Sequence, residues 1–191
     1  LIREPIIESI PVRSFLNEIC QEASRIMGTR IIDIIQKHNN ENYIEMDKNS
    51  LRKVFEGILR NAIENTPDES IIEVRSKKDN ESVVVEFVDW GVGISPQNQK
   101  MIFGGFFHTQ DTNRYSSKER YNFNAGGWGT ELLRTKVLSE RFGFSIVFSS
   151  KRCSHLPLNS DECVGKISAC PFVSNRKECF HSGGSTFTLI F

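Results

Sequence analysis

The sequence predicts an α+β fold, a two-layer α/β sandwich in which helices cover one face of a mixed β-sheet. Two observations lead to this prediction. Segments with the apolar spacing of amphipathic helices alternate along the chain with pairs of short, strand-like segments. The length of 191 residues also suits one ordinary domain with a sizeable core, and argues against two full domains.

Two helices and two strands are expected in the first third of the chain. Residues 11–27 carry apolar side chains at helical spacing. Two strand-like segments follow over 30–36 and 43–46, and the polar turn between them predicts a hairpin. The next helix has Asp47 as its N-cap, a residue type that accepts hydrogen bonds from free backbone N–H groups, and Pro67 closes it.

The rest of the chain contains the other expected elements and two irregular segments. Residues 71–76 and 82–89 predict a second hairpin, whose second strand is apolar enough to be central in the sheet. Further helices are expected over 97–103 and 131–142, and further strands over 144–149 and 186–191. A long polar segment, 104–127, and an insertion that contains cysteines, about 151–182, lie between these elements. A loop as long as 104–127 is uncommon in a compact domain and is usually functional.

The overall charge and hydropathy exclude several classes of partner. Lys and Arg number 24, as do Asp and Glu, so the net charge is zero and gives no sign of a nucleic-acid partner. No apolar run approaches the roughly 18 residues that span a bilayer, and no segment resembles a signal peptide. We therefore expect a cytoplasmic domain without direct membrane contact, either free or as the cytoplasmic part of a membrane-bound receptor.

Two motifs at the ends of predicted elements combine polar side chains with glycines. Asn61 lies near the end of the second helix, off its apolar stripe, and its amide oxygen is a suitable ligand for Mg²⁺. Asp89 ends the apolar strand, where its carboxylate can accept a hydrogen bond from an exocyclic amine such as that of adenine. Gly91 and Gly93 allow the backbone to turn sharply and to approach a planar ring.

Two further glycine motifs follow later in the chain. Residues 126–129 lead into the predicted helix at 131, and glycines there expose free N–H groups to phosphate oxygens. Residues 183–187 open the final strand, where glycine and hydroxyl groups can line a nucleotide pocket. Each motif alone also has an ordinary explanation: a solvated asparagine, a glycine turn, a flexible hinge or a strand start.

The order of these motifs is more specific than any one of them. With the phenylalanine-rich stretch at 102–109 between them, it resembles the ordered boxes of the catalytic domain of sensor histidine kinases. That family shares the Bergerat ATP-binding fold with the gyrase, heat-shock chaperone and mismatch-repair ATPases. The resemblance covers nearly all of 11–191 outside the insertion.

The resemblance implies ATP and Mg²⁺ as cofactors. Asn61 matches the catalytic, Mg²⁺-binding asparagine, Asp89 matches the aspartate that recognises adenine, and 104–127 corresponds to the ATP lid. Phe103, Phe106 and Phe107 match the aromatic box that flanks the lid. Gly184 and Ser185 match the last glycine box of the family. The nucleotide contacts implied are Asn61, Asn65, Asp89, Gly91, Gly93, Ile94, Phe107, Gly127, Gly129, Thr130, Ser185 and Thr186.

The resemblance also implies a reaction that needs a partner. The γ-phosphoryl group of ATP passes to a histidine on the dimerisation and histidine-phosphotransfer domain of the same kinase, and a response-regulator receiver domain acts downstream. That histidine sits on a helix beside an acidic residue. His38, His108, His155 and His181 do not fit, because none has an acidic neighbour or lies within a predicted helix. Residues 1–10 are interpreted as the end of a connector from the missing dimerisation helices.

Several positions depart from the family pattern. Gly57 stands where a second asparagine is frequent, and glycine costs about 1 kcal/mol relative to alanine inside a helix. Glu64 and Asn65 stand where a basic and an aromatic residue are frequent. Thr130 and Glu131 replace a leucine and a glycine. Candidates for the missing positive charge are Arg114, Lys118 and Arg120 in the lid.

These departures leave two alternatives to a kinase domain. The first is a non-catalytic regulatory module of the same fold that responds to nucleotide or to redox state. The second is a hydrolytic ATPase that uses a carboxylate base on the Asn61 helix. Gly57 argues against the second, because it occupies the position expected for that base, and Glu56 points a different way around the helix.

Four cysteines crowd into the insertion: Cys153, Cys163, Cys170 and Cys179. The interpretation that we favour is that they are small buried apolar residues of a loop subdomain. A structural zinc site is an alternative, with His155 and His181 as further candidate ligands, although no Cys-x-x-Cys pair occurs. A redox-sensing pair is the third possibility.

Overall fold

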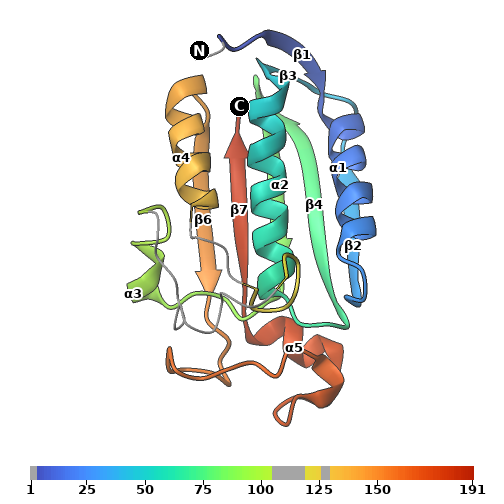
Figure 1. Ribbon diagram of the computed structural model, residues 1–191, viewed down its shortest axis with the longest axis vertical. Coiled ribbons are helices and arrows are strands. Elements are labelled where there is room, and N and C mark those ends of the chain that lie inside the picture. The colour runs from blue at the N-terminus through green and yellow to red at the C-terminus, as the bar shows by residue number, and fades with distance from the viewer. Residues whose placement is uncertain (1–3, 105–118, 126–129) are drawn as a thin grey trace.

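The computed structural model describes residues 4–104, 119–125 and 130–191, and its centre is a five-stranded mixed sheet covered on one face by helices (Figure 1). This architecture confirms the predicted fold class. The strands lie in the order β2 (Ile32–His38), β4 (Ser70–Asp79), β5 (Ser82–Asp89), β7 (Gly184–Ile190) and β6 (Ser145–Lys151). The covering helices are α1 (Val12–Ile26), α2 (Lys48–Asn65) and α4 (Glu131–Phe142). The smaller elements are β1 (Ile7–Pro11), β3 (Tyr43–Asp47), α3 (Pro96–Gln99), the 3₁₀ helix η2 (Ile167–Ala169) and α5 (Arg176–Ser182).

Helix α2 is the centre of the core between the sheet and the helical layer. Its apolar stripe is fully buried, and Phe55 packs its ring against that of Phe87 on β5 at 5.8 Å between centroids. The helix starts as the sequence predicted, because the Asp47 side chain accepts a hydrogen bond from the Ser50 N–H at 2.8 Å. The central position of β5 fixes where its last residue, Asp89, emerges.

The first predicted hairpin is wrong. Strand β2 pairs in parallel with β4, and β3 pairs antiparallel with β1, so that Ile44 faces Ile10. A polar turn indicates where a chain reverses, but not which strand becomes the partner, and parallel pairing requires a crossover, here through α2. Most of strand β1 lies within residues 1–10, which were interpreted as a connector, and the strand ends at Pro11. The second hairpin, β4 with β5, is confirmed, while α3 is shorter than the helix expected over 97–103.

Arg30 connects the start of β2 to the end of α2. Its side chain is 5% exposed and forms an ion pair with Asp68 at 2.7 Å. The same guanidinium donates hydrogen bonds to the backbone carbonyls of Ile63, Thr66 and Tyr121. The guanidinium also lies over the ring of Phe123, 5.9 Å from its centroid, so this buried cation fixes the end of α2 against residues 119–125.

Among the described helices, none is long and apolar enough to cross a membrane.

Replacement of Arg30 by methionine is expected to lower the free energy of unfolding by about 3 kcal/mol, because three carbonyl groups lose a hydrogen-bond donor and Asp68 loses its ion pair. Urea unfolding measures the change. Arg25→Met, on the exposed face of α1, is the matched control and is expected to stay within about 0.5 kcal/mol of the wild type. Equal effects of the two substitutions would contradict the role given to Arg30.

Candidate functional site

The end of α2 and the glycine turn after β5 are joined by close backbone contact. The N–H of Val92 donates to the carbonyl of Asn65 at 3.1 Å. A Cβ atom on Gly91 would overlap that same carbonyl, so that only glycine fits at this position. The contact brings Asn61, Asn65 and Asp89, three of the predicted site residues, to one end of the sheet.

Asp89 is a buried carboxyl group at the last position of β5. It is 4% exposed, and its Oδ1 accepts the Gly91 N–H at 2.9 Å. Burial raises the pKa of Asp89 to about 7, although hydrogen bonds from the backbone N–H groups of Gly91 and Ser185 oppose this shift. The group is therefore a hydrogen-bond acceptor whose charge changes close to neutral pH, in a position to take an N–H donor from a ligand.

The last glycine box divides between the two faces of the sheet. Ser185 is paired opposite Asp89 in the β5–β7 ladder, and its hydroxyl lies 3.0 Å from that of Ser150. Thr186 is paired with Val88, so its side chain points to the other face, where it lines a surface hollow with Trp90. The Ser185 side chain thus lies on the same face of the sheet as Asp89 and the Thr186 side chain on the opposite face, although all three residues line that hollow.

Gly93 and Ile94 attach the glycine turn to β6. Gly93 has φ of +63°, and a Cβ atom there would overlap the carbonyl of Lys151. The N–H of Ile94 donates to the Ser150 hydroxyl at 2.8 Å. The predicted turn residues are therefore held between α2 on one side and β6 on the other, which fixes the backbone around Asp89.

Glu64 and Arg60 form a buried ion pair that the sequence analysis did not anticipate. The Glu64 side chain lies 3.5 Å from Arg60 and accepts the N–H of Tyr121 at 3.2 Å. Burial raises the pKa of Glu64, while the positive charge of Arg60 opposes the shift. Glu64 stands at a position where the family frequently has a basic residue, and here it holds the segment 119–125 through its hydrogen bond with Tyr121. The spacing of four residues within one helix was the signal available for this pair.

Two departures from the family pattern explain each other. A Cβ atom on Gly57 would lie 3.1 Å from the carboxylate of Glu131 at the start of α4. Glu131 in turn pairs with Arg60 at 3.3 Å. Glycine at position 57 thus leaves room for the Glu131 side chain against α2, a contact that offsets part of its poor helix propensity. Thr130 is the N-cap of α4, but its side chain makes no capping hydrogen bond.

Asn61 and Asn65 interact across one helical turn. The Asn65 amide donates to the Asn61 backbone carbonyl at 2.8 Å, and more weakly to the Asn61 side-chain oxygen at 3.4 Å. Both residues are half-buried.

The predicted aromatic box and lid are only partly described. Phe103 packs edge-on against Phe148 and Phe187, so it belongs to the core. Arg120 is exposed, and its charge opposes the rise that burial causes in the pKa of Glu64. The other predicted residues of this region lie outside the described residues: Phe106, Phe107, His108, Arg114, Lys118, Gly127 and Gly129.

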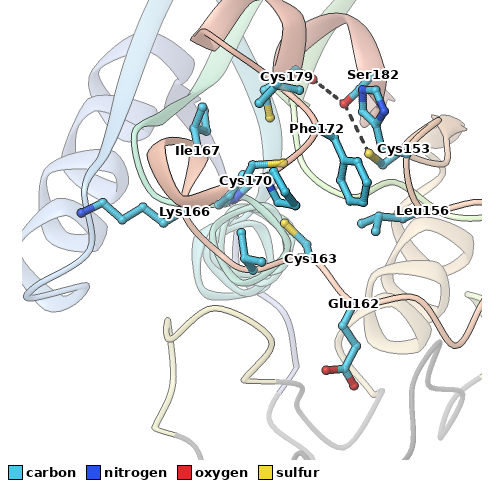
Figure 2. A pocket seen from close by; sticks show the side chains of 15 residues that line it. Cys153, Leu156, Glu162, Cys163, Lys166, Ile167, Cys170, Phe172, Cys179 and Ser182 are labelled. Carbon is cyan, nitrogen blue, oxygen red and sulfur yellow. Dashed lines mark hydrogen bonds between the residues drawn. The ribbon is translucent and has the colours of Figure 1, made fainter.

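The four clustered cysteines lie at the same end of the sheet as the glycine turn. All are free and half-buried, whereas the favoured sequence interpretation expected buried residues. All four line one pocket of the insertion (Figure 2). Within 4–104, 119–125 and 130–191, no group of three or more His, Cys, Asp or Glu side chains is already arranged to hold a metal ion.

Known proteins share both the sequence pattern and the fold. Residues 46–191 match the family described as histidine kinase-, DNA gyrase B- and HSP90-like ATPase. Sporulation kinase C of Bacillus subtilis (strain 168) is 28% identical over 102 residues, which cover 50% of this chain and 24% of that protein. The mycobacterial sensor histidine kinase MprB has a TM-score of 0.68 at 16% identity, with 97% of both chains covered. The structure of full-length ShkA in complex with AMPPNP also has a TM-score of 0.68 at 16% identity, with 100% of this chain and 32% of that chain covered.

The chain belongs to the family of histidine kinase-, DNA gyrase B- and HSP90-like ATPases, as the sequence resemblance implied. Its domain type is the catalytic ATP-binding domain of sensor histidine kinases. Membership of this ATPase family implies that the chain binds ATP. The chain spans about a quarter of the length of sporulation kinase C, whose other parts have no counterpart in the match.

The buried Asp89 is expected to make the unliganded protein less stable as the pH rises. Its pKa in the folded state, about 7, exceeds its ordinary value of 3.8, so its contribution to stability is complete below about pH 4 and is lost as the pH rises through 7. Asp89→Asn removes this contribution, which has a slope of up to about 1.4 kcal/mol per pH unit. Urea unfolding from pH 4 to 8 measures it, with Asp79→Asn on the β4–β5 turn as control. Identical pH profiles for the wild type and Asp89→Asn would refute the assignment.

Proposed function

We propose that the chain binds Mg·ATP through Asp89 and Asn61 and donates the γ-phosphoryl group to a histidine outside this sequence, within a two-component sensor histidine kinase. The observation that carries the proposal is the buried Asp89 carboxyl, held beside the end of the Asn61 helix by the contact between Gly91 and Asn65. The structure of full-length ShkA with the ATP analogue AMPPNP supports it as a nucleotide-bound protein of the same fold.

Asp89 is the residue proposed to select adenine. An ionised carboxylate only accepts hydrogen bonds, so it suits the exocyclic amine of adenine and not the carbonyl oxygen of guanine at the same ring position. Gly91 donates to one carboxylate oxygen, Oδ1, and fixes the orientation of the group. A ligand N–H donor favours the charged form and draws the pKa of Asp89 down from about 7.

The side chain of Asn61 fits a role in holding Mg²⁺. Its amide oxygen is half-buried and accepts one long hydrogen bond, 3.4 Å, from Asn65. An amide oxygen is a hard ligand, and Mg²⁺ commonly takes few protein ligands and completes its coordination with water and phosphate oxygens. When bound, the ion neutralises charge on the phosphate chain. Asn61 would then position the triphosphate, with Arg114, Lys118 or Arg120 supplying further positive charge from the lid, proposed to span about 104–127.

The accepting imidazole is proposed to come from the separate dimerisation domain, to which residues 1–10 would connect. In the transfer, the bond between the γ-phosphorus and its bridging oxygen breaks, a bond to the imidazole nitrogen forms, and ADP leaves. The histidines described here have other partners. His38 bonds to Ser76 at 2.8 Å, His155 stacks on Phe172, and His181, in α5 although no helix was predicted there, lies 2.6 Å from the Lys177 carbonyl. A response-regulator receiver domain is the proposed downstream partner.

One observation favours the alternative of a regulatory module that binds nucleotide without transferring phosphate. Glu131 places a negative charge in the first turn of α4, near where the resemblance puts the phosphates. A helix N-terminus favours anions, so a carboxylate there competes with a phosphate group. The ion pairs of Glu131 with Arg60 and Arg134 reduce that competition, which is why we place kinase function first.

Mg·ATP is expected to raise the melting temperature by about 5–10 °C at a hundredfold excess over Kd, because it binds only the native state. Mg·GTP is expected to give no comparable rise. Asp89→Asn should abolish the effect of ATP, and Asn61→Ala should remove its dependence on Mg²⁺. Asn49→Ala, exposed at the other end of α2, is the matched control and should behave as the wild type. Equal stabilisation of Asp89→Asn by ATP would refute the proposed adenine contact.

The chain alone is expected to stay unlabelled with radioactive ATP, and to phosphorylate a histidine hairpin of the same kinase when that hairpin is supplied separately. Asn61→Ala should lose the transfer, since the positioning of the triphosphate depends on it. Binding of ATP without transfer would support the regulatory module, whereas labelling of the chain itself on histidine would refute the absence of an acceptor.

A further inference from the structure

The insertion between β6 and β7 has little apolar core of its own. The structure describes residues 152–183 without a gap, and over this range Leu156 and Ile167 are the apolar side chains that are buried. Its regular elements are η2, with three residues, and α5, with seven. Segments shorter than about 40 residues usually need disulfides, metals or other cross-links to hold a fixed structure.

The insertion is nevertheless attached to the main domain at several places. The N–H of Cys153 donates to the carbonyl of Val92 at 2.8 Å, and Gly165 accepts from the N–H of Asp68 at 2.8 Å. The two ends of the insertion are also joined to each other, since the carbonyl of Ser182 accepts the N–H of Ser154 at 2.9 Å. Cys153, Cys163 and Cys179 lie at or near these contacts, since Cys163 is two residues from Gly165 and Cys179 three from Ser182.

All four cysteines of the insertion line one pocket, which lies at its centre (Figure 2). Leu156, Ile167 and Phe172 complete much of its wall, and its cavity volume is about 60 Å³. The thiols come from four different parts of the insertion, so a cross-link among them would connect its whole length. None of them forms a disulfide.

The chemistry of the pocket suits a soft divalent cation better than oxidation. All four thiols are half-buried among apolar side chains, with Leu156, Ile167 and Phe172 in the same wall. Thiols in apolar surroundings react slowly with oxidants, so the pocket is poorly suited to sensing peroxide. Four cysteines are also the donor set of structural zinc sites, in which all four ligands come from protein.

We propose that Cys153, Cys163, Cys170 and Cys179 bind one Zn²⁺ ion that cross-links the insertion. No three described donors already stand in a coordinating arrangement, so binding requires the cysteine side chains to turn toward a common point. Each thiol gives up its proton to solvent as its sulfur binds, so one Zn²⁺ and four thiols yield a site of net charge −2 and four protons. The positive charge of Arg152, which acts on Cys163, partly compensates this negative charge.

The proposed ion would also affect the turn that follows Asp89. Cys153 is both a ligand and, through its backbone N–H, the partner of Val92 inside that turn. A Cβ atom on Gly183 would lie 2.8 Å from the nitrogen of Cys153, so the two ends of the insertion meet here in close contact. Zinc would thus hold the backbone beside the nucleotide site, a consequence that rests on the proposed function, whereas zinc binding itself does not.

Metal analysis of the chain, purified without chelators under reducing conditions, is expected to find about one zinc ion per chain. Substitution of Co²⁺ should give the thiolate-to-metal charge-transfer absorption of a cysteine site. Cys163→Ser and Cys170→Ser should each lower the zinc content at least tenfold, while Cys20→Ser, a matched change in α1, should retain it. Retention of zinc in Cys163→Ser, or absence of both zinc uptake and the cobalt band in the wild type, would overturn the proposal.

A thiol count on the wild-type chain gives a second test that needs no variant. With zinc bound, four thiols should be protected from a thiol reagent, and a chelator should expose them. Detection of no metal and of two fewer free thiols than the sequence has cysteines would overturn the proposal in favour of a disulfide. Asp89→Asn is expected to lose stabilisation by ATP but keep its zinc, so failure of the zinc site and failure of the nucleotide site are distinguishable.

Discussion

The contact between the end of α2 and the turn after β5 is the constraint on which the site depends. Val92 donates to the Asn65 carbonyl, and Gly91 fits against the same carbonyl because it lacks a Cβ atom. Without this approach, an asparagine on a helix and an aspartate on a strand would not share one end of the sheet. The site is therefore a property of backbone packing first, and of the side chains that the packing brings together second.

The same packing explains why Asp89 is poised near neutral pH. The turn closes over the carboxyl and removes it from water, while two backbone N–H groups offset only part of the cost of the charge. In the unliganded domain, a hydrogen-bond donor that reaches the Asp89 carboxyl group would therefore stabilise its charged form. The stability of the empty domain and its affinity for a ligand are linked through this one side chain.

Much of the fold, and part of the site, could be predicted from the sequence. The apolar stripe of α2, its Asp47 cap and the β4–β5 hairpin are local patterns, and each was recovered. The pairing of β2 with β4 is not local, because it is decided by where α2 packs, and the turn chemistry near Asn40 contains no information on that. Thr186 shows a similar limit, since a motif names adjacent residues while a strand turns them to opposite faces. The Arg60–Glu64–Glu131 group was missed because it combines a local spacing with a contact from another helix.

The insertion leaves a β-hairpin whose two strands are registered over seven pairs, from Ser145 with Ile190 to Lys151 with Gly184. Because the ladder determines this register, the connection needs only to bring the strand ends together, and each doubling of its length costs only about 0.6 kcal/mol in closure entropy. The sheet can therefore accept connections of very different length and content at this point. Evolution, or protein engineering, can exchange an accessory module here, next to the proposed nucleotide site, while the strands of the sheet keep their register.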